Sequence, residues 1–110
     1  MKSCFIILAG GESKRFNSKI PKCYYMYRGK PLLLHSIDKA KKYGKFSKIL
    51  LIINRKHKFY IDKLKIKDIK IVIGGKTRAE SAYRALLSIK KYNIKNILIH
   101  DAARPNFSLK

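Results

Sequence analysis

Acidic residues are scarce in this sequence: 6 Asp and Glu stand against 27 Lys and Arg among 110 residues, so the formal net charge is +21. There is no tryptophan, and the 2 cysteines, Cys4 and Cys23, form no CxxC pair. Two such cysteines cannot build a disulfide framework, which suits a reducing cytoplasm. No apolar run approaches the roughly 18 residues that a membrane span requires, so no membrane partner is expected.

The first ten residues only weakly imitate a signal peptide. Their apolar stretch is about the minimum of ~7 residues, and it leads into Glu12, Lys14 and Arg15 without a small-x-small cleavage site. We interpret this run as a buried strand. The length allows one domain, and a hydrophobic content of 46% rules out wholesale disorder despite the charge. Residues 1–110 are therefore expected to form a single domain.

The excess of lysine is explained better by a solvated surface than by a nucleic-acid site. The lysines are scattered along the chain, and those at 39–48 look like one helix face and the loop after it. Residues 22–28 interleave aromatic and basic side chains, as single-strand binders do, but a short strand after a loop is the simpler interpretation. No specific nucleic-acid partner is expected.

Four short apolar runs predict strands that are buried on both faces, because they are rich in isoleucine and lack clean polar alternation. These runs are Cys4–Leu8, Ile49–Ile53, Ile69–Ile73 and Ile97–Ile99.

Segments of helical period lie between the runs. The first starts at Pro31 and ends where Gly44 can act as a C-cap glycine, and a weaker one covers about His57–Leu64. The third opens with the capping box at 77–80 and continues with Ala82, Leu86 and Ile89 at helical spacing. Strands that alternate with helices predict right-handed crossovers and an open, layered, parallel α/β sheet.

Polar loops follow three of the four runs, at residues 9–15, 74–78 and 101–105. In open parallel sheets, ligands bind beyond the carboxyl ends of the strands, so these loops should open on one edge. Gly10 and Gly11 let the backbone approach a phosphate closely, although a tight turn with exposed bases is an alternative for the two glycines alone.

The sequence matches neither of two common phosphate-binding motifs. The first loop is not G-x-G-x-x-G, and Gly75-Lys76-Thr77 imitates a P-loop but has Lys70 where the earlier glycine belongs. Asp101 ends a predicted strand, where a carboxylate either caps the next turn or helps to hold Mg²⁺ together with water and substrate phosphates. Basic loops with one acid suit nucleotidyl transfer, in which positioning and charge neutralisation do most of the work.

Taken together, these loops resemble those of the 2-C-methyl-D-erythritol 4-phosphate cytidylyltransferases, the CTP-using enzymes of the non-mevalonate isoprenoid pathway. The resemblance runs from Cys4 to Pro105. Its segments are LAGGESKR at 8–15, PK at 21–22, GKPL at 29–32, GGKTRAES at 74–81 and HDAARP at 100–105. The last two segments are the most specific. The resemblance implies the N-terminal half of a three-layer, Rossmann-like nucleotidyltransferase fold with a mostly parallel sheet.

The resemblance also implies roles for individual residues. In the family, the substrate's phosphate attacks the α-phosphorus of CTP and pyrophosphate leaves. Arg15 and Lys22 would be catalytic, because they would stabilise charge on the five-coordinate phosphorus. Asp101 would help to place Mg²⁺, and Arg78 and Arg104 would be mainly structural. The nucleotide would contact small residues of the loops, which are Ala9, Gly10, Gly11, Gly75, Ser81 and Ala102.

Some features depart from the family's pattern. Ser13 replaces a usual glycine, Glu12 puts a negative charge beside the phosphate path, and Lys76 stands where an acid is common. Family members are longer, and their other half carries a second metal-binding acid, a substrate-positioning lysine and the arm used for homodimerisation. Two alternatives stay open: a ribitol- or other polyol-phosphate cytidylyltransferase, and a non-catalytic nucleotide- or RNA-binding remnant.

Overall fold

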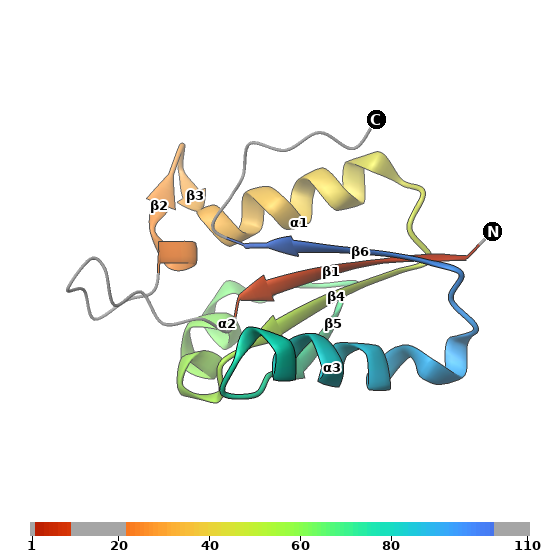
Figure 1. Cartoon of the computed structure of the whole chain (residues 1–110). Coiled ribbons are helices and arrows are strands. Elements are labelled where there is room, and N and C mark those ends of the chain that lie inside the picture. Colours follow the sequence, from red (N-terminus) through yellow and green to blue (C-terminus); the bar gives the residue numbers. More distant parts are fainter. Residues whose placement is uncertain (1, 10–21, 103–110) are drawn as a thin grey trace.

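The protein contains a four-stranded parallel sheet, seen in a computed structural model that describes residues 2–9 and 22–102 (Figure 1). The strand order is β5-β4-β1-β6, so the first strand of the chain lies in the middle of the sheet. The strands are β1 (Ser3–Ala9), β4 (Lys48–Ile53), β5 (Lys70–Ile73) and β6 (Asn96–Asp101). Each neighbouring pair is parallel, which confirms the predicted α/β fold.

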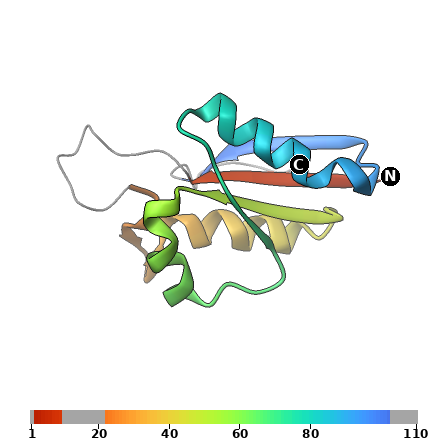
Figure 2. The same ribbon diagram turned by 90° about the horizontal axis from the view of Figure 1, so that it is seen from below.

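Helices cover both faces of the sheet and make three layers. Helix α1 (Leu32–Tyr43) and helix α2 (Lys58–Leu64) pack on one face, and α3 (Arg78–Ile89) packs on the other (Figures 1 and 2). Because successive strand residues point to opposite faces, each central strand supplies both sides of the core. Phe5 belongs to the cluster under α1, and its neighbour Ile6 belongs to the cluster under α3.

The helix ends follow from local sequence. Helix α1 begins directly after Pro31 and ends at Tyr43, and Gly44 caps it with a φ of 73°, in the left-handed region that glycine tolerates best. Helix α3 begins after Thr77, whose hydroxyl accepts a hydrogen bond from the backbone N–H of Glu80. The Glu80 carboxylate accepts from the N–H of Lys76 at 2.8 Å, so the reciprocal half of the capping box lies one residue earlier than its usual position.

Two expectations about burial were wrong. The runs at Ile69–Ile73 and Ile97–Ile99 are not buried on both faces within the described residues, because β5 and β6 are the two edge strands of the sheet. Helix α3 buries Ser81, Ala85 and Ile89 rather than the Ala82-Leu86-Ile89 stripe, and Leu86 is 40% exposed.

Short elements complete the described structure. They are the 3₁₀ turns η2 (Lys22–Tyr24), η3 (Arg55–His57) and η4 (Lys90–Tyr92), and the antiparallel pair β2 (Met26–Tyr27) and β3 (Lys30–Pro31). The residues at 22–28 therefore form a turn and a short strand. Among the described helices, none has the length and apolar character needed to cross a membrane.

Candidate functional site

The carboxyl ends of the strands share one edge of the sheet, as the parallel pairing requires. Strand β1 ends at Ala9, β5 at Ile73 and β6 at Asp101 (Figure 1). Helix α3 also begins at this edge, because it follows β5 after a short loop. We call this edge the rim. The structure therefore confirms that the predicted loops after β5 and β6 start on the same side of the fold.

The loop after β5 is held closely against the N-terminal turn of α3. The N–H of Gly74 donates to the carbonyl of Ile53 at 2.8 Å, and the N–H of Gly75 donates to Oγ of Ser81 at 3.1 Å. Arg84 adds a third hydrogen bond, from Nη1 to the Gly74 carbonyl at 3.3 Å. Strand β4, helix α3 and the loop thus fix one another.

Both glycines of this loop are required by packing inside the fold. A Cβ atom on Gly74 would lie 2.5 Å from Oγ of Ser81 and 2.9 Å from a methyl of Ile52. A Cβ atom on Gly75 would overlap the side chain of Glu80. The glycine pair therefore lets α3 approach the loop, which is a reason for these residues that the sequence did not reveal.

Ser81 lies beneath the loop rather than on the open surface. Its side chain is buried, and its hydroxyl accepts the hydrogen bond from Gly75. Sequence reasoning placed Ser81 against a ligand. The structure gives it a second task, which is to hold the Gly75 backbone in place.

Asp101 ends β6 with its carboxylate at the rim. Oδ1 lies 3.4 Å from Nε of Arg78, the first residue of α3. The two side chains are 38% and 65% exposed, respectively, so solvent and solutes reach this ion pair. The sequence assigned Arg78 only a structural role, and the pairing of the two motifs could not be found without the strand order.

The two alanines of the predicted site have their methyl groups in the core. Ala9 and Ala102 belong to the same buried cluster as Cys23 and Tyr24 of η2. The N–H of Ala102 donates to the carbonyl of Leu8 at 2.9 Å, which joins the end of β6 to β1. Because the side chains are buried, these positions can offer a ligand mainly backbone groups.

The remaining predicted residues are described incompletely or lie outside the described residues. Lys22 starts η2, next to two residues packed in the core with Ala9, which sets its backbone near the end of β1. Gly10, Gly11 and Arg15 lie outside the described residues, as does Arg104. Within residues 2–9 and 22–102, no three His, Cys, Asp or Glu side chains form a metal-binding group.

Comparison with known proteins identifies the family. The profile of the 2-C-methyl-D-erythritol 4-phosphate cytidylyltransferases (IspD) matches residues 3–109. The chain belongs to this family. The structural resemblance agrees: the bifunctional IspDF of Campylobacter jejuni superposes with a TM-score of 0.80 at 30% identity, over 98% of this chain and 28% of that one.

Two curated relatives show how much of the family's length is present. The bifunctional enzyme IspD/IspF of Pelagibacter ubique is 73% identical over all 110 residues, which span 30% of that protein. The 2-C-methyl-D-erythritol 4-phosphate cytidylyltransferase of Clostridium botulinum (strain Loch Maree) is 38% identical over 94% of this chain and 47% of its own length. The chain thus spans from about a third to about half of the relatives it matches.

Proposed function

We propose that this chain supplies the nucleotide-binding part of an enzyme that transfers a cytidylyl group from CTP to 2-C-methyl-D-erythritol 4-phosphate. The observation that carries the proposal is the family match over residues 3–109, together with two of its motif loops at one rim. A phosphate oxygen of the acceptor attacks the α-phosphorus of CTP. The new O–P bond forms as the bond to the bridging oxygen of the β-phosphate breaks, and pyrophosphate leaves.

Nucleotide selection rests on the rigidity of the rim. The Gly75 backbone is fixed by Ser81, and the backbone around Ala9 and Ala102 is fixed by the sheet. Gly10 and Gly11 would extend this surface toward the phosphates. A preformed surface of backbone donors and acceptors discriminates between bases because a wrong base leaves polar groups of the site unpaired.

Catalysis would depend on positive charge near the α-phosphorus. Arg15 and Lys22 are proposed to stabilise the charge that develops when phosphorus becomes five-coordinate, and such fixed charges act mainly in the transition state. The net charge of +21 also attracts the anionic substrates from a distance, an effect that salt weakens.

A divalent cation, Mg²⁺ in our proposal, fits Asp101. The carboxylate is partly exposed, and magnesium commonly takes one or two carboxylates while substrate phosphates and water fill the other positions. The cation would neutralise phosphate charge during transfer. Asp101 would offer one oxygen to it, and Arg78 would have to share or release that carboxylate. We also propose that the enzyme acts as a homodimer in the cytoplasm.

The proposal is tested by calorimetry of the chain with CTP, ATP and GTP at equal Mg²⁺. CTP should bind most tightly, and equal binding of all three nucleotides would overturn the base-selective site. A polyol-phosphate cytidylyltransferase would show the same preference, so a pyrophosphate-release assay with methylerythritol phosphate and ribitol phosphate follows in a protein that includes this chain and the rest of the family's length. Faster turnover with ribitol phosphate would overturn the proposed acceptor.

A further inference from the structure

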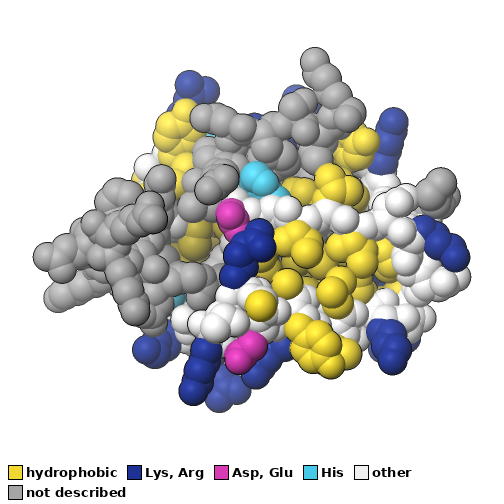
Figure 3. Space-filling model, in the orientation of Figure 1, with side chains coloured by type: hydrophobic (Ala, Val, Ile, Leu, Met, Phe, Trp, Pro, Cys, Tyr) yellow, Lys and Arg dark blue, Asp and Glu magenta, His cyan; other side chains and the backbone are white. Residues whose placement is uncertain are grey.

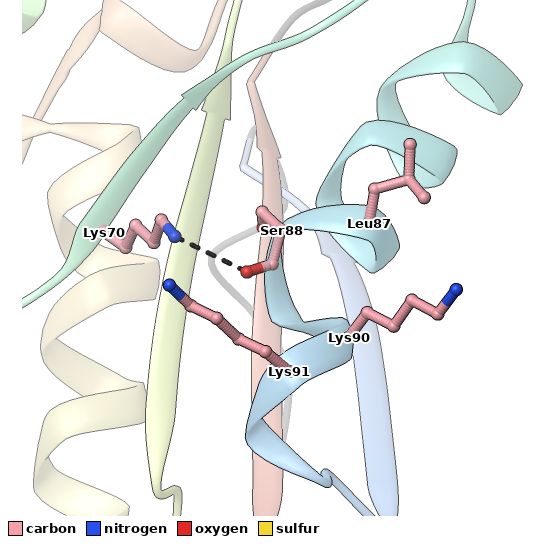
Figure 4. Close-up of a pocket in the computed structure, with 5 residues that line it drawn as sticks. All are labelled: Lys70, Leu87, Ser88, Lys90 and Lys91. Atoms are coloured by element: carbon pink, nitrogen blue, oxygen red, sulfur yellow. Dashed lines mark hydrogen bonds between the residues drawn. The ribbon is translucent and has the colours of Figure 1, made fainter.

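A pocket lies away from the rim, where β5 begins and α3 ends. Its volume is about 590 Å³, and it is lined by Lys70, Leu87, Ser88, Lys90 and Lys91 (Figure 4). Because β5 runs toward the rim and α3 runs away from it, the pocket is at the opposite end of the sheet from Asp101. The pocket is open to solvent, so a ligand there would be held by charge rather than by enclosure.

Three ammonium groups gather around one aromatic ring beside this pocket. The Nζ atom of Lys48 lies 3.8 Å from the centre of the Tyr92 ring, that of Lys91 lies 5.3 Å from it, and that of Lys70 lies 5.7 Å from it. They come from three different elements, β4, η4 and β5. We call Lys48, Lys70 and Lys91 the lysine cluster. In Figure 4, Lys70 and Lys91 extend toward the same space, whereas Lys90 points away.

Within the described residues, no ion pair joins an acid to the lysine cluster. Asp38 pairs with Lys30, Asp62 with Lys58, and Asp101 with Arg78, while the Glu80 carboxylate accepts from the N–H of Lys76. Asp68 lies two residues before Lys70 in the sequence and forms no ion pair with it. Lys70 donates to the carbonyl of Ser88 at 3.5 Å, near the end of α3. A helix C-terminus carries only about half a negative charge, so it balances a small part of three positive ones.

The positive electrostatic potential of the lysine cluster lowers the pKa of the Tyr92 phenol. Lys48 lowers its pKa most, followed by Lys91, with Lys70 adding to the effect and partial burial opposing it. These three lysines are the charged groups that face the ring from the neighbouring strands and from η4. A tyrosine with a lowered pKa marks a place where a negative charge is stabilised.

We propose that this pocket binds a small anion that carries two or more linked phosphate groups. Lysine ammonium groups bind phosphate as point charges, and three of them match a diphosphate or triphosphate better than a single phosphate. Single-stranded RNA fits less well, because it needs aromatic faces for stacking and Lys48 already lies over the Tyr92 ring.

The test follows Tyr92 by NMR of the ring-labelled chain while inorganic pyrophosphate is added at constant ionic strength. Binding should raise the Tyr92 pKa toward its ordinary value, because the anion neutralises the lysines that lower it. Inorganic phosphate should bind about tenfold more weakly than pyrophosphate. A parallel titration with ATP shows whether the site takes free pyrophosphate or the phosphate groups of a nucleotide. A Tyr92 response to either anion supports the site, and a response to neither overturns it.

Matched variants separate this pocket from the rim and from general attraction by net charge. The double variant Lys70→Gln/Lys91→Gln should weaken pyrophosphate binding about tenfold. Lys42→Gln/Lys67→Gln removes the same charge from exposed positions outside the pocket and should leave binding nearly unchanged. Equal losses in the two variants would overturn the proposal, as would an RNA oligonucleotide that displaces pyrophosphate from Tyr92. If the first variant does not fold by circular dichroism, the Tyr92 titration of the unsubstituted chain decides alone.

Discussion

The Nε atom of Arg78 lies 3.4 Å from Oδ1 of Asp101, so the first residue of α3 and the last residue of β6 are joined across the rim. The pair connects the two most specific motif loops of the sequence. It also gives the proposed cation-binding carboxylate a competing positive partner. A cation that binds Asp101 must therefore replace, or share the carboxylate with, the guanidinium.

Replacing Arg78 should change metal binding in a predictable direction. We expect Arg78→Gln to tighten Mn²⁺ binding by up to about fivefold, because an exposed ion pair contributes at most ~1 kcal/mol. Water proton relaxation of Mn²⁺ in the presence of CTP measures the effect. Arg84→Gln is the matched control, since it removes the same charge from a residue that contacts the Gly74 carbonyl instead. Weaker Mn²⁺ binding in Arg78→Gln alone would mean that the arginine orients the carboxylate for the cation.

The Ser81 hydroxyl should contribute to stability as well as to the site. Ser81→Ala removes the acceptor of the Gly75 N–H in a partly buried place, and a lost partner of this kind costs about 1–3 kcal/mol of the unfolding free energy. Ser88→Ala is the control, because its hydroxyl donates to the carbonyl of Ala85 within the same helix. Urea denaturation of both variants gives the comparison. Equal, small losses would contradict the structural role of Ser81.

The buried thiols should make the fold sensitive to alkaline pH. Burial raises the pKa of Cys23 from about 9 to about 12, and it raises the pKa of Cys4 to about 11, although Lys48 acts in the opposite direction there. In the unfolded chain both thiols titrate near their ordinary pKa. Their contribution to stability is therefore complete below about pH 9 and is lost as the pH rises from 9 toward 11–12.

Unfolding in urea between pH 7 and pH 10.5 tests this effect. Lysines also titrate in this range, so the informative quantity is the difference between the chain and its Cys23→Ala variant. The chain should lose more stability than the variant above pH 9. A constant difference across the range would show that the thiolate is not excluded from the folded state.

The sequence predicted the elements better than their burial. Isoleucine-rich runs and capping residues such as Thr77 and Gly44 are local signals, and the strands and helices formed where those signals stood. Strand order is not a local property. It places β5 and β6 at the edges, which explains why Ile71 and Leu98 are 40% and 44% exposed although their runs read as fully buried.

For the candidate site, too, the sequence predicted the features that depend on local signals and missed those that depend on tertiary contacts. The sequence predicted that Asp101 and Gly75 lie at one edge of the sheet, because both stand at or after the ends of predicted strands and parallel strands bring such residues together. The Arg78–Asp101 pair and the lysine cluster were not predicted, because each joins elements far apart in the sequence. The steric need for Gly74 also depends on a tertiary contact, with Ser81 and Ile52.

An apolar surface covers the outer side of α3 and the neighbouring edge strand β6 (Figure 3). Its side chains are between 39% and 62% exposed: Tyr83, Leu86, Leu87, Ile97, Leu98 and Ile99. An open strand edge with apolar neighbours promotes pairing with other chains. We therefore expect the 110-residue chain to self-associate, and more strongly as salt screens its positive charge.

Sedimentation velocity over a range of protein and salt concentrations measures this association. The double variant Leu86→Lys/Ile97→Lys should shift the chain toward monomer, because it places charge within the apolar surface on both α3 and β6. Phe59→Lys/Met26→Lys is the matched control: it adds the same charge at two apolar side chains that are also exposed, by 58% and 68%, but lie on α2 and β2. If net charge alone governed association, both variants would dissociate equally. A selective effect of the first variant identifies the α3–β6 surface as the one through which copies of the chain associate.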